Sequence, residues 1–179
     1  TKFPPFDQIR VAPDAPLPQH KPRVYGAKLR SMLNRMTAEL VEFDFIEESQ
    51  ANCASAVVLV KKPHSNERRL CVDYRDLNAV TAACATPGHD LRSIMAATSG
   101  AQWFSTIDFS KGYHHLAIKD PKVRDLTTFV TEDSKYRWKV APFGLKNSGH
   151  SFVQAVRNML KGLEGIAQWV DDLLIYART

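Results

Sequence analysis

Apolar residues recur with the period of a helix in two parts of this chain and form short runs elsewhere, and these two patterns predict its helices and strands. Over residues 29–40 the apolar positions return every three or four residues, which is the stripe of an amphipathic helix that ends in an acidic run. A second helical stripe covers residues 152–163, with Asn147 or Ser148 available as its N-cap and Gly165 as its end. The pattern therefore predicts two amphipathic helices far apart in the chain.

Shorter runs that are rich in β-branched and aromatic residues predict strands. The expected strands cover residues 56–60, 69–74, 103–109, 113–118, 127–130 and 136–140, followed by a last pair that turns at or near Asp171 and Asp172. A short helix over residues 90–97 is expected before the strand over residues 103–109. Because helices and short strands mix without regular βαβ alternation, the order predicts an α+β domain with an antiparallel sheet and packed helices.

Three carboxylates lie within the apolar frames of these strands. Asp108 follows the run 103–107, and Asp171 and Asp172 precede the run 173–176. An acid that is buried in a strand costs free energy unless it is paired or holds a cation. Because Mg²⁺ prefers carboxylate oxygens, two such strands side by side would form a site for two-metal phosphoryl transfer. A solvated turn is the alternative reading of a bare Asp-Asp pair.

Composition narrows the class of protein without deciding its chemistry. The chain has 179 residues, of which 44% are apolar, and this is enough for one folded domain. The formal net charge is +5, and residues 61–76 hold five bases against three acids, which indicates a local basic surface. Three irregularly spaced cysteines favour a reducing, intracellular compartment, cytoplasmic or nuclear, over a disulfide framework or a zinc site. No apolar run approaches the roughly 18 residues of a membrane span.

Proline divides the chain into two expected parts. Residues 1–23 contain six of the ten prolines and show no periodicity, so we expect an extended arm that is laid over the domain or is partly mobile. Residues 24–179 are then the folded domain.

Read in order, five segments of the chain resemble reverse transcriptases. They are residues 57–62, 69–78, 104–108, 141–145 and 170–172. The best match is to the Ty3/gypsy type of long-terminal-repeat retrotransposons, and it covers roughly residues 40–179. The resemblance implies the fingers and palm of a right-hand polymerase and RNA-directed DNA synthesis as the activity. It also implies an RNA or DNA template-primer and deoxynucleoside triphosphates as partners, with an oligomer or the rest of a polyprotein as further partners.

The resemblance assigns roles to single positions. Asp108 and Asp171 are implied as the metal ligands, with Asp172 as the neighbouring acid. They would hold two Mg²⁺ ions, or Mn²⁺, that activate the primer 3′-hydroxyl and stabilise the leaving pyrophosphate. Lys62 and Arg69 resemble the fingers residues that hold the triphosphate of the incoming nucleotide, one as a mobile charge and the other as a planar fork.

The nucleotide pocket is implied by a second group of positions. Tyr113 resembles the sugar gate, a ring below the 2′ position that excludes ribose. Gly112 would let the backbone approach the phosphates, and Phe143 and Gly144 resemble the segment that lines the pocket. The positions that resemble template or primer contacts are Arg75, Trp169 and Val170.

The chain also departs from the family pattern. Trp169 stands where the family usually has Tyr, His115 where Gln is common and Gly149 where Pro is common. The chain stops seven residues after Asp172, so we expect a domain truncated after the Asp-Asp motif and weak or absent polymerisation by this fragment. The alternative is a domesticated or degenerate polymerase fold that serves as a non-catalytic nucleic-acid-binding or protein-binding module. A metal site shared by His114 and His115 is not expected, because neighbours in a strand face opposite ways.

Overall fold

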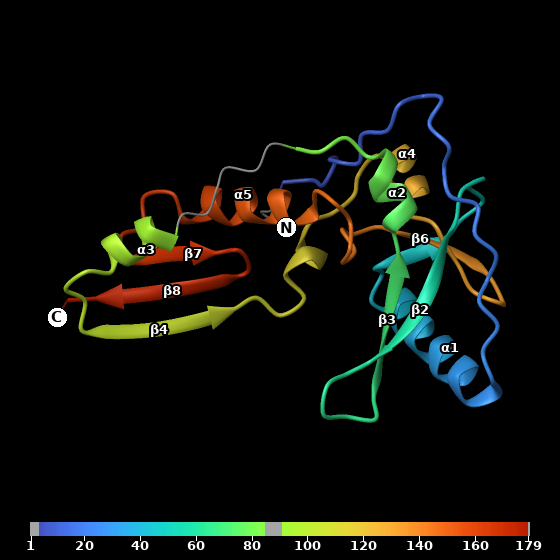
Figure 1. Ribbon diagram of the computed structural model, residues 1–179, viewed down its shortest axis with the longest axis horizontal. Coiled ribbons are helices and arrows are strands. Elements are labelled where there is room, and N and C mark those ends of the chain that lie inside the picture. Colours follow the sequence, from blue (N-terminus) through green and yellow to red (C-terminus); the bar gives the residue numbers. More distant parts are fainter. Residues whose placement is uncertain (1–3, 85–90, 179) are drawn as a thin grey trace.

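Two separate β-sheets organise the chain, as shown by a computed structural model that describes residues 4–84 and 91–178 (Figure 1). The strands are β1 (Ile46–Glu48), β2 (Ser55–Lys61), β3 (Arg68–Asp73), β4 (Trp103–Asp108), β5 (Phe129–Val130), β6 (Lys135–Trp138), β7 (Ile166–Trp169) and β8 (Asp172–Ala177). The helices are α1 (Ala27–Glu42), α2 (Arg75–Val80), α3 (Leu91–Ala97), the 3₁₀ helix η1 (Gly112–His115), α4 (Pro121–Leu126) and α5 (Ser148–Leu160).

The strand order confirms the predicted α+β class. One sheet has the order β1-β6-β5-β2-β3 and the other has the order β4-β8-β7. Strands β2 and β3 form an antiparallel hairpin, with Ala56 opposite Asp73 and Lys61 opposite Arg68. The strand pairings are antiparallel, as predicted, except that β2 and β5 pair in parallel through Ser55 and Phe129.

Two predicted elements differ from the structure for identifiable reasons. Residues 113–118 do not form a strand, because the chain turns through η1 and makes only an isolated bridge at Ala117. The helix over 152–163 ends at Leu160, where Lys161 leaves helical dihedrals and Gly162 takes a φ of +88°. Glycine reaches that left-handed region without steric cost, so Gly162 breaks the helix before Gly165.

Two helices, α2 and α4, and the short strand β1 were not predicted. The start of α4 does carry a local signal, because Asp120 precedes Pro121 at the first helical position. The Asp120 side chain accepts a hydrogen bond from the backbone N–H of Lys122 at 2.9 Å. This Asp-Pro pair therefore marks the start of the six-residue helix α4.

The segment before α1 packs along the domain (Figure 1). Phe6 is 1% exposed and belongs to the core, and its backbone N–H donates to the carbonyl of Ala117 at 2.8 Å. Farther along, the Tyr25 hydroxyl donates to the carbonyl of Val57 at 3.0 Å. No helix in the described ranges 4–84 and 91–178 is both long and apolar enough to cross a membrane.

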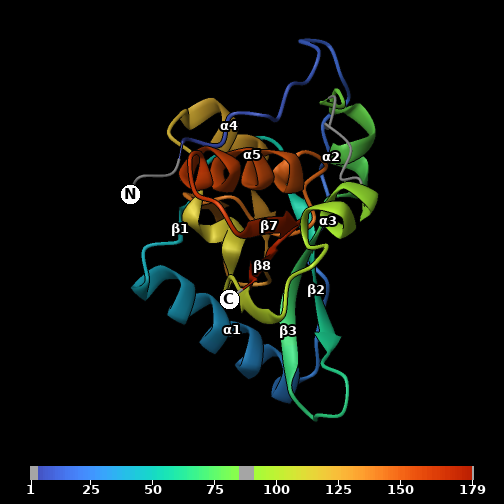
Figure 2. The same cartoon turned by 90° about the vertical axis from the view of Figure 1, so that its left-hand side faces the viewer.

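The three-stranded sheet is covered by helices on one side only. Helices α3 and α5 contact β7 and lie on the same side of this sheet (Figures 1 and 2). Strand β4 is the edge of the sheet and is exposed along its whole length, with Trp103 at 68% and Phe104 at 55%. The apolar frame of Asp108 therefore does not bury it, because the frame belongs to an edge strand with an open face.

We predict that Phe6→Ala destabilises the chain by about 3 kcal/mol, because it removes a fully buried aromatic side chain. Urea unfolding followed by circular dichroism measures this change. Leu17→Ala, also in the proline-rich segment but 37% exposed, is the matched control and should cost much less. Equal effects of the two substitutions would show that the segment does not contribute to the core.

Candidate functional site

Strands β4 and β8 bring two of the three predicted acids together. The antiparallel register pairs Asp108 with Asp172, which places their Cα atoms about 4.5–5.5 Å apart and their side chains on one face of the sheet. Asp171 lies in the two-residue turn between β7 and β8. All three acids are exposed, so the expectation of buried carboxylates is wrong. No side chain in the described part of the chain forms an ion pair or hydrogen bond with any of them.

The chemistry of this acid group fits a divalent cation. Two carboxylates directly opposite each other in a sheet repel, and a cation between them would remove that repulsion. Their oxygens are also the ligands that Mg²⁺ prefers. Among residues 4–84 and 91–178, however, no three acid, histidine or cysteine side chains lie close enough together to hold an ion. The donor type therefore fits, and the side chains would have to rotate toward one another to share a cation.

The turn that carries Asp171 has an unusual backbone. Val170 has a φ of +54°, in the left-handed region that β-branched residues rarely adopt. Trp169 pairs with Asp172 across the hairpin and is 42% exposed. The predicted template or primer positions Trp169 and Val170 therefore flank the acids directly.

Tyr113 lies next to this turn inside an aromatic cluster. Its ring meets Phe143 edge-on, with centroids 5.0 Å apart, and contacts Phe152 at 5.4 Å. Burial and then the charge of Asp171 raise the pKa of the Tyr113 phenol. The structure thus places Tyr113 beside Phe143, as expected of two positions that the resemblance assigns to one nucleotide pocket, and near Asp171, which it assigns to the metal.

The two predicted glycines serve different structural needs. A Cβ atom on Gly112 would lie 2.8 Å from the Phe152 ring, so Gly112 lets η1 pack closely on α5. The side of Gly112 on which a Cβ atom would stand therefore faces the core. The prediction was that Gly112 lets the backbone approach phosphates. Gly144 has a φ of +89°, and its carbonyl accepts a hydrogen bond from the Asn78 side chain at 2.8 Å. Asn78 also accepts from the backbone N–H of Lys146 at 2.8 Å, so it fixes the Phe143–Gly144 loop from both sides.

The predicted cations of the β2–β3 hairpin differ in their pairing. The Lys62 ammonium forms an ion pair with Glu67 at 2.6 Å, and both side chains are exposed. Arg69 is exposed on β3, opposite Val60. The hairpin therefore presents Lys62, which is paired with a carboxylate, and Arg69, which is exposed on β3.

Arg75 is held by a neighbour within its own segment. Its guanidinium donates two hydrogen bonds to Asp73, at 2.8 and 2.7 Å. Hydrogen bonds from Arg75, together with the charges of Arg75 and Arg23, lower the pKa of Asp73 to about 2 against the opposing effect of burial. Arg75 would have to exchange this bidentate partner for a phosphate to contact a template.

His114 is a part of the site that the sequence did not indicate. Its ring contacts Phe45 at 5.0 Å, Phe143 at 5.3 Å and Trp138 at 5.4 Å. Both ring nitrogens are buried without a hydrogen-bond partner, and burial followed by the charge of Lys111 lowers the pKa of His114 to about 4. The prediction that His114 and His115 face opposite ways assumed that they lie in a strand. That assumption is wrong, because both residues lie in η1.

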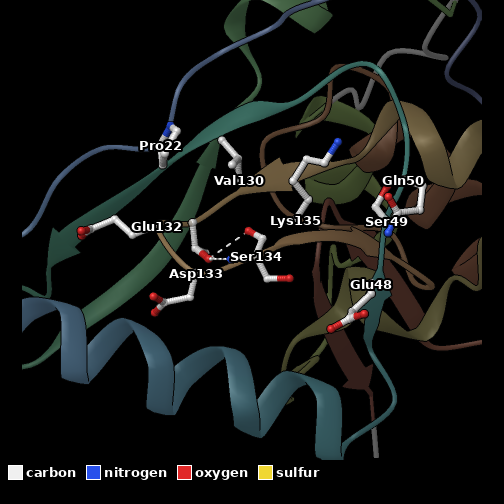
Figure 3. A pocket seen from close by; sticks show the side chains of 10 residues that line it. Pro22, Glu48, Ser49, Gln50, Val130, Glu132, Asp133, Ser134 and Lys135 are labelled. Carbon is white, nitrogen blue, oxygen red and sulfur yellow. Dashed lines mark hydrogen bonds between the residues drawn. The ribbon is translucent and has the colours of Figure 1, made fainter.

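The best-defined hollows in the described part of the chain are not lined by the three acids. One of about 410 Å³ is lined by β1 and by the turn between β5 and β6 (Figure 3). Two of its acids bind residues of α1 or the residue before Gly26. Glu132 accepts a hydrogen bond from the backbone N–H of Tyr25. Asp133 accepts hydrogen bonds from the side chains of Arg30 and Asn34. This hollow therefore belongs to the packing of α1 against the larger sheet.

Comparison with known proteins gives a consistent result. Residues 60–179 match the family described as reverse transcriptase (RNA-dependent DNA polymerase). The chain is 30% identical over 159 residues to the retrovirus-related Pol polyprotein from transposon opus of Drosophila melanogaster, covering 86% of this chain and 16% of that protein. It is 31% identical over 147 residues to the enzymatic polyprotein of Cestrum yellow leaf curling virus, covering 79% of this chain and 23% of that protein.

A solved structure shares the fold. The protease-reverse transcriptase of prototype foamy virus superposes with a TM-score of 0.84 over 98% of this chain and 23% of that chain, at 22% identity. A foamy viral protease-reverse transcriptase in complex with an RNA/DNA hybrid gives a TM-score of 0.85, at 24% identity. The chain thus spans less than a quarter of the length of these four proteins.

We predict that His114→Phe reduces the acid sensitivity of folding. The folded-state pKa of His114, about 4, lies below the ordinary value of 6.5, so only the unfolded chain takes up the proton between these values. Stability from this group is present above pH 6.5 and is lost as the pH falls toward 4, by about 2 to 3 kcal/mol. Urea unfolding at several pH values measures the loss, which should be smaller in the variant.

The matched control for this prediction is His64→Asn, which removes an exposed imidazole from the loop between β2 and β3. It should keep the acid dependence of the wild-type chain. If His114→Phe also keeps it, another group causes the acid sensitivity.

Proposed function

This chain belongs to the reverse transcriptase family, and on that premise we propose that it carries the nucleotidyl-transfer site of a Ty3/gypsy-type polyprotein. The reaction is the RNA-directed addition of deoxynucleotides to a primer 3′-hydroxyl. The observation that supports this proposal best is the register of β4 and β8, which sets Asp108 opposite Asp172 next to the turn with Asp171. A like-charged pair of this kind is unfavourable in a sheet that has no cation to bind.

Each group of the site has a role in the proposed reaction. Asp108 and Asp171 would hold Mg²⁺, with Asp172 beside them; when bound, the metal lowers the pKa of the primer hydroxyl and neutralises phosphate charge. Lys62 and Arg69 on the hairpin bind the triphosphate of the incoming nucleotide. These five side chains come from four different strands or their ends, β2 and β3 in one sheet and β4 and β8 in the other.

The sugar and the base are placed by the aromatic cluster. Tyr113 is half-buried between Phe143 and Phe152, so its ring is held in place and can exclude a 2′-hydroxyl by contact. Phe143 is 51% exposed and offers a ring face beside it. Asn78 holds the loop that carries Phe143.

The proposed partners are a template-primer, deoxynucleoside triphosphates and the rest of the polyprotein, in an intracellular setting. The foamy viral protease-reverse transcriptase with an RNA/DNA hybrid supports the template-primer, because the two chains share a fold. Binding of a template-primer should depend on phosphate contacts and therefore on salt, since a polymerase accepts any sequence.

We predict that Asp108→Asn and Asp171→Asn each weaken Mn²⁺ binding by this chain by about tenfold or more and reduce primer extension on an RNA template to background. Electron paramagnetic resonance measures free Mn²⁺, and gel electrophoresis measures extension with Mg²⁺. Asp14→Asn, an exposed acid before α1, is the matched control. Unchanged Mn²⁺ binding in both variants would contradict the metal assignment. Salt-sensitive nucleic-acid binding without metal-dependent extension would support the non-catalytic alternative.

We predict that Glu67→Gln tightens the binding of deoxynucleoside triphosphates by about twofold to fivefold at low salt. The substitution frees the Lys62 ammonium from its ion pair, and the effect is small because exposed pairs are weak. Equilibrium titration at low and high salt measures it, with Glu164→Gln at another exposed acid as the control. Weaker binding in Glu67→Gln would mean that the pair orders the hairpin and does not compete with the nucleotide.

A further inference from the structure

Gln168 places an amide in an apolar layer. In β7 it lies opposite Leu173, which is 6% exposed and belongs to the core, and both side chains face α3 and α5. The Oε1 atom of Gln168 is buried and has no hydrogen-bond partner. A buried polar atom without a partner is unfavourable, so packing alone does not explain an amide at this position.

The other end of this amide holds the turn that carries the acids. The Nε2 atom of Gln168 donates to the carbonyl of Val170 at 2.9 Å. Val170 is the first residue of the two-residue turn and has a φ of +54°. Such turns favour glycine or asparagine at positions of positive φ, so the sequence Val170-Asp171 does not stabilise this turn by itself.

Few other contacts hold this turn. Within residues 4–84 and 91–178, the bond from Gln168 is the one side-chain hydrogen bond to Val170 or Asp171. A hollow of about 280 Å³ lies beside Gln168, between β7, α3 and α5, and neither residue of the turn lines it. The hydrogen bond from Gln168 therefore opposes a change in the backbone of the turn.

We propose that Gln168 is a positioning residue that fixes the Val170–Asp171 turn, and through it the Asp171 carboxylate, for cation binding. This inference rests on the proposed function, in which Asp171 is a metal ligand.

The first test uses the complete 179-residue chain and Mn²⁺ as the probe. Gln168→Met removes the donor and keeps the length of the side chain. We expect it to weaken Mn²⁺ binding by about fivefold to tenfold, as loss of an outer-shell partner does at other metal sites. Gln102→Met, an exposed amide just before β4, is the matched control and should bind as the wild-type chain does.

The second test separates positioning from a general loss of packing. Val170→Gly removes the strain of the positive φ, so the turn no longer needs the amide. In the Val170→Gly background we expect Gln168→Met to change Mn²⁺ binding by less than about twofold, a rescue that a packing defect would not show. A full fivefold to tenfold loss in this background would overturn the proposal.

A third measurement needs no metal. It separates the case in which Gln168 does not fix the turn from the case in which the acids bind no metal. The three-bond coupling between the amide and α protons of Val170, measured by NMR on the labelled chain, reports its φ. If the wild-type chain binds no Mn²⁺, the metal assignment fails, yet Gln168→Met should still change this coupling. If Gln168→Met leaves both the coupling and Mn²⁺ binding unchanged, Gln168 does not position the turn.

Discussion

The register between β4 and β8 is the constraint on which the rest of the site depends. A slip of one residue would turn every side chain of β8 to the other face of the sheet. In the observed register, Leu173 faces α5 and is 6% exposed, while Asp172 faces the open side opposite Asp108. The buried apolar side of the sheet thus holds two like charges together on its open side, against their repulsion.

Helix α5 supports both halves of the site. Phe152 on this helix contacts the Tyr113 ring and fills the space that a Cβ of Gly112 would need. The same helix packs against β7, which leads into the turn with Asp171. Because Tyr113 and the strand that leads to Asp171 rest on one helix, side-chain packing limits how far they can move relative to each other, and the conformation of the Val170–Asp171 turn sets the rest.

The sequence could predict the elements whose pattern is local and not those that depend on distant contacts. Local patterns predict the apolar stripes of α1 and α5 and the two strand runs of the β2–β3 hairpin. The structure contains all of these elements. Residues 113–118 have the composition of a strand, yet Gly112 draws them into η1 through its contact with Phe152. The apolar frame of Asp108 could not distinguish an edge strand with an open face from a buried strand. Asn78 acts on Gly144 across 66 positions, which no local pattern records.

The charges of the site are balanced unequally, and in the proposed function this inequality makes nucleotide binding depend on a cation. Lys62 is paired with Glu67 and Arg75 with Asp73, whereas Asp108, Asp171 and Asp172 have no counter-charge in the described residues. A triphosphate that approached these acids would meet their repulsion, and the hairpin cations could offset only a part of it. A divalent cation would remove the repulsion between the acids and add attraction for the phosphates at the same time. In the proposed reaction the cation is therefore what lets the acids and the basic hairpin bind one nucleotide.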